Sequence, residues 1–268
     1  MLRAIQSGSS CEEEHANRVV SMGEKNMQKI AGLAVLVLVS AAVQSADPAP
    51  LGVPPSVATY LEKVASAGKP GPRASLEPVY DAALAVQNDL MTISKDLAWL
   101  EYLSDADFAK LRSRLKGFVL SRGVDIFADP DPKFFRELAE QHGEPADLAF
   151  FNLLEKSLAA DYLPIYVKSQ GRGVCVRYGE NVIQPYYAGW LDYLHQSPAR
   201  YKLKVAQSIS DLEDAVGLGT CACGDIDSVQ QELKSFVNRF PTAGINGKVR
   251  DRIEQLDKDP WKLPVHCT

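Results

Sequence analysis

The chain has 268 residues, 46% of them hydrophobic, and 29 Lys+Arg against 34 Asp+Glu give it a formal net charge of −5. This acidic balance argues against a nucleic-acid-binding protein, which needs basic side chains to displace the counterions of phosphates. GxSxG, P-loop, GxGxxG and HExxH motifs are absent from the sequence, so it suggests no catalytic residue, no cofactor and no metal.

The first recognisable element is an export signal at residues 27–46. Lys29 supplies a positive charge, and the fourteen residues Ile30–Val43 contain Ser40 as their only polar side chain. A membrane-spanning helix needs roughly 20 apolar residues, whereas shorter runs are typical of a cleaved signal. We therefore expect a mature protein in the bacterial periplasm with no stable membrane span. An uncleaved N-terminal anchor is the alternative.

Residues 1–26 are polar and show no apolar periodicity. We expect translation to begin at Met27 or Met22, which would make residues 1–26 a spurious extension. The alternative is a long, disordered segment ahead of the signal. Residues 1–46 hold four of the 29 basic and four of the 34 acidic residues, so the mature chain keeps the net charge of −5.

The mature sequence predicts an all-α protein of eight or nine helices, with room for one small β element. Residues 47–75 are expected to form a Pro-rich lead-in, a short helix and a linker, and residues 76–164 a helical domain. In that domain we expect one long helix over 76–103, a second from Asp105 to a stop at Gly123 with Ser104 as its cap, a third over 132–141 capped by Asp131, and a fourth that opens at Pro145.

Residues 165–268 are expected to form a helical subdomain that contains the cysteines. Residues 165–178 combine alternating side chains, β-branched residues and glycines, which is typical of either a short hairpin or an irregular connection. The helices expected after it span about 181–195, 197–216, 227–240 and 248–257.

Four cysteines remain in the mature chain: Cys175, Cys221, Cys223 and Cys267. In an oxidising compartment this even number predicts two disulfides. Cys221 and Cys223 are too close in sequence to bridge each other without strain, so one should pair with Cys175 and the other with Cys267. A metal site is the alternative, although C-x-C does not match the C-x₂₋₄-C spacing of zinc sites.

An aromatic segment supplies the candidate contact residues for a protein partner. Tyr187, Trp190 and Tyr193 lie close together in sequence, and Arg172 and Arg177 precede them. Tyr, Trp and Arg carry much of the binding energy at protein interfaces. The alternative is a tyrosine-rich core whose hydroxyl groups reach the surface.

These features favour a periplasmic binding or inhibitor protein without catalytic activity. Its most concrete form is an immunity protein that neutralises a secreted toxin or another enzyme acting in the bacterial envelope. The alternative is an exported cell-wall or glycan hydrolase, since such an enzyme needs only two suitably spaced carboxylates. The sequence does not identify that pair among its many acidic residues.

Overall fold

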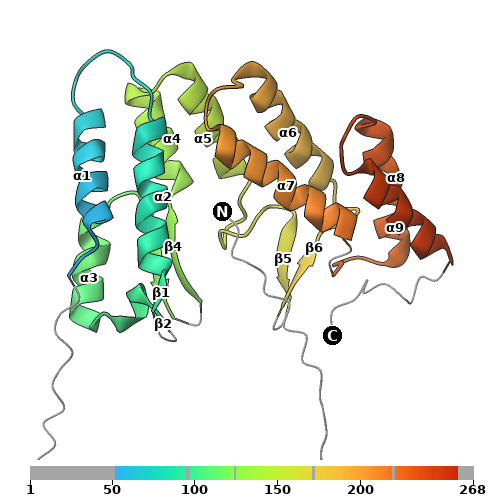
Figure 1. The fold of residues 1–268 in the computed structure, drawn as a ribbon, viewed down its shortest axis with the longest axis horizontal. Helices are drawn as coiled ribbons and strands as arrows, with labels where there is room; N and C mark the ends of the chain where they lie inside the picture. Colours follow the sequence, from blue (N-terminus) through green and yellow to red (C-terminus); the bar gives the residue numbers. More distant parts are fainter. Residues whose placement is uncertain (1–51, 95–96, 124, 171–172, 219–220, 259–268) are drawn as a thin grey trace, which may run out of the picture. The chain divides into compact units, whose positions relative to one another are not determined.

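The computed structural model describes residues 52–94, 97–123, 125–170, 173–218 and 221–258, and the signal segment lies outside them (Figure 1). The α-helices in this part are α1 Pro55–Ala67, α2 Glu77–Met91, α3 Asp105–Arg114, α4 Pro132–His142, α5 Pro145–Lys156, α6 Ile183–Gln196, α7 Lys202–Leu218, α8 Ile226–Arg239 and α9 Asn246–Lys258. None of these helices combines the length and apolar character needed to cross a membrane.

The mostly helical prediction is confirmed, but the protein is not purely α. Three two-stranded antiparallel hairpins lie between the helices of the described chain. They pair β1 Ile93–Ser94 with β2 Leu97–Ala98, β3 Phe118–Arg122 with β4 Ile126–Pro130, and β5 Val167–Gln170 with β6 Gly173–Val176. The third hairpin decides between the two alternatives left open for residues 165–178.

Three helices begin at the positions predicted from their capping residues or first proline. The Ser104 hydroxyl accepts from the Asp107 N–H at 3.1 Å and caps α3. The Asp131 carboxylate accepts from the Lys133 N–H, also at 3.1 Å, and caps α4. Pro145 occupies the first position of α5, where its missing N–H would have had no partner within the helix.

The long helix predicted over residues 76–103 is wrong, because α2 ends at Met91. Thr92, at the end of α2, has extended backbone angles (φ −63°, ψ 122°). Thr92 and the residue after it are β-branched and weak helix formers. The chain turns through the β1–β2 hairpin and re-enters as the 3₁₀-helix η1 Trp99–Tyr102, which buries Leu100 completely. The residues that predicted one helix thus belong to α2, the β1–β2 hairpin and η1, and Leu97 of β2 is 41% exposed.

The helix predicted from Asp105 to Gly123 is also too long. α3 ends at Arg114, and Gly117 then adopts a positive φ of 75°. A Cβ at Gly117 would lie 2.3 Å from the Phe134 ring, so this close turn favours glycine. The turn reverses the chain into β3, where Phe118 and its successors alternate between two faces instead of following a helix.

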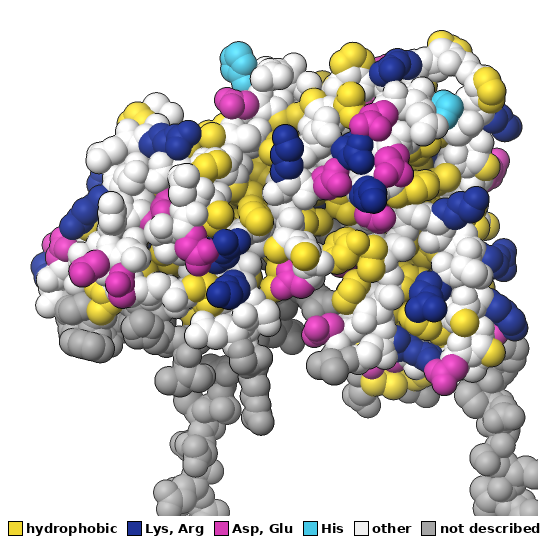
Figure 2. All heavy atoms as spheres, turned by 180° about the vertical axis from the view of Figure 1, so that it is seen from behind, with side chains coloured by type: hydrophobic (Ala, Val, Ile, Leu, Met, Phe, Trp, Pro, Cys, Tyr) yellow, Lys and Arg dark blue, Asp and Glu magenta, His cyan; other side chains and the backbone are white. Residues whose placement is uncertain are grey.

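Helices next to each other in sequence pack in pairs, α1 with α2, α4 with α5, α6 with α7, and α8 with α9. Further contacts join α5 to α6 and α7 to α9. On the face shown in Figure 2, basic and acidic side chains lie interspersed instead of forming a field of one sign.

An aromatic cluster around Phe150 of α5 forms the centre of the core. The Phe150 ring stacks on Tyr201 with centroids 3.8 Å apart, and it contacts Tyr80 at 5.5 Å, Trp190 at 5.9 Å and Tyr193 at 5.7 Å. These rings come from α2, α5, α6 and the residue before α7. One core cluster therefore contains side chains from both segments that the sequence divided at residue 164.

We expect Phe150→Ala to lower the free energy of unfolding by about 3–5 kcal/mol, because it leaves a cavity among packed rings. Leu203→Ala is the matched control, since Leu203 is 87% exposed and its loss should change stability by less than about 0.5 kcal/mol. Urea denaturation followed by circular dichroism measures both. Equal effects of the two substitutions would contradict the central place of Phe150.

Candidate binding site

The three aromatic residues predicted to contact a partner are buried. Tyr187, Trp190 and Tyr193 are 2%, 0% and 4% exposed. α6 packs on two sides: Trp190 and Tyr193 face the Phe150 cluster, and the Tyr187 ring lies 5.0 Å from Phe236 of α8. Their positions are those of the alternative interpretation, a tyrosine-rich core, and a buried ring presents no surface to a partner.

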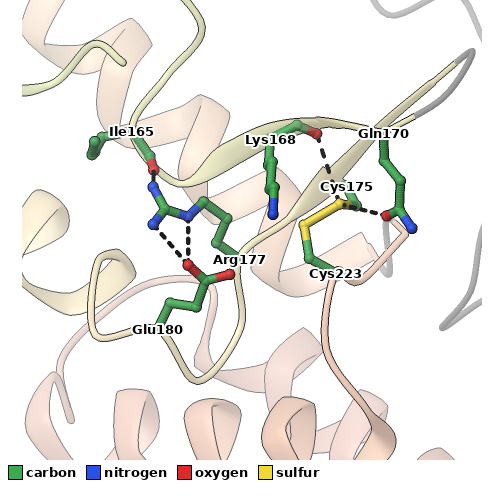
Figure 3. The surroundings of a disulfide bond; sticks show 7 residues. All are labelled: Ile165, Lys168, Gln170, Cys175, Arg177, Glu180 and Cys223. Atoms are coloured by element: carbon green, nitrogen blue, oxygen red, sulfur yellow. Dashed lines mark hydrogen bonds and ion pairs between the residues drawn. A yellow bond between two sulfur atoms is a disulfide. The ribbon is translucent and has the colours of Figure 1, made fainter. Parts of the chain in front are cut away.

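The two arginines predicted beside them are Arg172 and Arg177. Arg172 lies outside the described residues. Arg177 directly follows β6, where it pairs with Glu180 through two nitrogens at 2.7 and 2.8 Å and donates to the Ile165 carbonyl at 2.9 Å (Figure 3). Arg177 therefore ties the two ends of the hairpin to the loop that leads into α6.

A disulfide fastens the same hairpin. Cys175 of β6 pairs with Cys223, 48 residues later, with Cα atoms 5.1 Å apart (Figure 3). This is one of the two pairings that the sequence allowed for Cys175. Cys221 is also disulfide-bonded, but Cys267 lies outside the described residues, so the pairing of Cys221 with Cys267 stays a prediction.

The C-x-C spacing has a structural reason. The segment that contains it runs parallel to β6, and the Val176 N–H donates to the Cys221 carbonyl at 2.7 Å while the Cys223 N–H donates to the Val176 carbonyl at 2.9 Å. Side chains alternate along an extended chain. Ala222 is buried, and both cysteines therefore lie on the opposite side, next to β6.

The hairpin buries its base and exposes its outer part. Val167 and Val176, which are paired in the register, are both buried. Lys168, Ser169 and Gln170 of β5 are exposed. A short polar projection is thus fastened at its root by a disulfide, a backbone bridge and an ion pair. Nothing in the sequence distinguished Lys168 and Gln170 as surface residues, because the hairpin itself was one of two alternatives.

A cluster of three carboxylates surrounds Arg200. Asp147 is 0% exposed, and one of its oxygens accepts from Arg200 and from the Tyr201 hydroxyl, each at 2.7 Å. Its other oxygen accepts from the Glu144 N–H at 2.8 Å. The carboxylates of Glu144 and Glu77 also pair with Arg200, at 2.8 and 3.2 Å.

This cluster holds three segments of the chain together, α2 through Glu77, α5 through Asp147 and the segment that enters α7 through Arg200. Tyr201 has a positive φ of 50°, a strained conformation for a bulky residue that persists only where its surroundings impose it. Burial and the hydrogen bond to Asp147 raise the pKa of Tyr201 far above its ordinary value. The sequence signalled none of these roles, since the partners lie more than 50 residues apart.

A second polar group lies on α7 and the elements beside it. Burial lowers the pKa of Lys204, and the nearby charge of Asp211 partly offsets this effect. The resulting pKa is about 8. The rings of Tyr166 and Tyr186 meet edge to face at 4.9 Å. Burial raises the pKa of Tyr186 to about 12, while the nearby Ser208 hydroxyl lowers it. An amine of this kind is partly neutral near physiological pH.

Comparison of the chain with protein-family models, with curated proteins and with solved structures found no match.

We expect Arg200→Met to lower the free energy of unfolding by about 3–5 kcal/mol, because it leaves the buried Asp147 carboxylate without its cation. Lys258→Met is the control, since its ion pair with Glu254 is exposed and should contribute less than about 1 kcal/mol. Urea denaturation of both variants, and of Arg200→Met combined with Asp147→Asn, measures the coupling. An additive double variant would show that the two side chains do not depend on each other.

Stability should rise with pH between about 8 and 10 through Lys204, whose folded pKa of about 8 lies below the unfolded value of about 10.4. In that window the unfolded state binds more protons, so raising the pH favours folding. Lys204→Met should remove this rise when urea denaturation is repeated from pH 7.5 to 9.5. Above pH 10 the tyrosines act in the opposite direction, because their folded pKa values are raised. Identical pH profiles for variant and parent would refute the assignment.

Proposed function

We propose that this protein is a non-catalytic binding protein of the bacterial periplasm and that its β5–β6 hairpin contacts a protein partner. The observation that carries the proposal is the exposed strand segment Lys168–Gln170, held at its base by the Cys175–Cys223 disulfide. The most concrete form of this function is an immunity protein, which neutralises a secreted toxin or an envelope hydrolase.

The fastened base supports binding because a preorganised segment loses less conformational entropy when a partner immobilises it. The hairpin is anchored by Arg177 as well as by the disulfide. Lys168 offers one cation to an acidic residue of the partner, while the chain as a whole, at a net charge of −5, favours encounter with a basic protein. A basic partner with a local acidic site satisfies both conditions.

The Cys175–Cys223 disulfide supports the periplasmic part of the proposal, because disulfides persist where thiols are not kept reduced. Residues 27–46 supply the export signal, and the described chain contains the Cys175–Cys223 bond.

An exported cell-wall or glycan hydrolase is the second candidate. The observation in its favour is the convergence of Glu77 and Glu144 on Arg200, where both carboxylates remain partly exposed. Against this stands the pairing of both carboxylates with the Arg200 guanidinium, which occupies the oxygens that a hydrolase would direct at its substrate. Release of soluble fragments from purified cell wall, lost in Glu144→Gln, would favour the hydrolase.

Export is tested by expressing the full chain in a bacterium and fractionating the cells. We expect a periplasmic product whose N-terminus lies between residues 44 and 47, since the small residues of a cleavage site end there. Edman sequencing or mass spectrometry of the intact protein reads the terminus. A product that stays in the cytosol with free thiols would contradict the proposed location.

The hairpin is tested by affinity capture from envelope extract with the parent protein and with Lys168→Glu combined with Gln170→Ala. We expect the captured partner to bind the variant at least about tenfold more weakly, because contact residues of this kind contribute 1–3 kcal/mol. Arg112→Glu, an exposed basic residue of α3, is the matched control and should bind like the parent. Deleting the gene should also make cells sensitive to their siblings. Equal capture by all three proteins would exclude the hairpin as the contact surface.

A further inference from the structure

The two sulfurs of the hairpin disulfide lie in different surroundings. Cys175 is only 3% exposed, whereas Cys223 is half-buried. The Sγ atom of Cys175 lies 3.1 Å from Oε1 of Gln170 and 3.7 Å from the Lys168 carbonyl oxygen (Figure 3). Two oxygen acceptors therefore face the buried sulfur.

A disulfide sulfur carries no hydrogen, so Cys175 has nothing to donate to these oxygens while the bond is closed. A thiol at the same place is a weak donor and can use either acceptor. The reduced form of Cys175 thus gains an interaction that the oxidised form lacks, and such a difference between two states is what shifts an equilibrium.

Opening the bond should loosen the hairpin without unfolding the helices. The backbone bridge between Val176 and the segment that contains Cys223 uses N–H and carbonyl groups instead of the sulfurs, and Ala222 between the two cysteines is buried. The aromatic cluster around Phe150 does not include either cysteine. The bond therefore acts on the rigidity of a surface projection more than on the core.

We propose that the Cys175–Cys223 bond is a redox switch that sets the order of the β5–β6 hairpin, with a dithiol as the reductant. That the switch also controls partner binding rests on the function proposed above.

The exchange begins at the accessible sulfur. A thiolate of the dithiol attacks Sγ of Cys223, forms a mixed disulfide and expels the Cys175 thiolate, which takes a proton from water. The second thiol of the reductant then attacks its own sulfur in the mixed disulfide, releases Cys223 as a thiol and closes a cyclic disulfide. Two electrons pass from the dithiol to the protein, and two protein thiols result.

The first experiment equilibrates the full chain in graded mixtures of reduced and oxidised dithiothreitol at neutral pH, then alkylates it and locates the free thiols by fragment mass spectrometry. Hydrogen exchange follows β5 and β6 in the same samples, with α2 as the internal reference. We expect Cys175 and Cys223 to open while the circular dichroism of the helices persists, and hairpin amides to exchange about tenfold faster or more. A bond that opens only together with loss of the helices would show a structural staple and overturn the switch.

Gln170→Leu tests the acceptor directly. Removing it should shift the dithiol equilibrium toward the disulfide about threefold, because a weak hydrogen bond of the thiol is lost. Ser169→Ala, whose side chain lies on the other face of the same strand, is the matched control and should leave the equilibrium unchanged. Equal equilibria for both variants would contradict the proposed stabilisation of the Cys175 thiol by Gln170.

The redox experiment needs no partner, so it fails or succeeds independently of the proposed function. If the oxidised protein captures no partner yet the hairpin loosens on reduction, the switch stands and the binding function falls. If Cys175→Ser combined with Cys223→Ser keeps the hairpin amides as protected as in the oxidised parent, the bond does not set the order of the hairpin and the switch is refuted.

Discussion

The buried carboxylate of Asp147 is the constraint on which the arrangement of this protein depends. A charge removed from water must be compensated by partners at hydrogen-bond distance, and Arg200 and the Tyr201 hydroxyl supply them at 2.7 Å. These partners come from the segment that enters α7, so they tie it to α5. The same contact places the Tyr201 ring on Phe150 and joins the charge cluster to the aromatic core.

Further contacts connect α7 and its neighbouring helices to that junction. The two residues that precede α7 by one and two positions are held by Asp147, and α7 itself packs on α6 and α9. At its last turn the buried Arg252 of α9 donates to the Val216 carbonyl at 2.8 Å and to the Tyr178 hydroxyl at 2.7 Å. A cation at this end satisfies carbonyl groups that have no partner within the helix. Both ends of α7 are therefore fixed by arginines, and the core has little freedom to rearrange.

The β5–β6 hairpin contrasts with this core. Its base is attached by one disulfide, one backbone bridge, the contacts of Arg177 and the buried side chains of Val167 and Val176, while the outer part of β5 is exposed. A projection attached in this way can change its order while the helices keep theirs, since local stability follows the local density of contacts. We therefore propose both partner binding and redox control for the hairpin, while the buried tyrosines of α6 contribute to the core.

The sequence by itself determined the helix starts at Ser104, Asp131 and Pro145, and it restricted Cys175 to one of two partners, because capping and ring closure are local chemistry. Only the tertiary structure decided where α2 stops, that Tyr187, Trp190 and Tyr193 face inward, and that Asp147 meets Arg200. Apolar periodicity reports which side chains avoid water, but the same spacing fits one long helix or two short elements. Contacts between residues 50 or more positions apart arise only when the packed core brings them together, and no local pattern in the sequence encodes them.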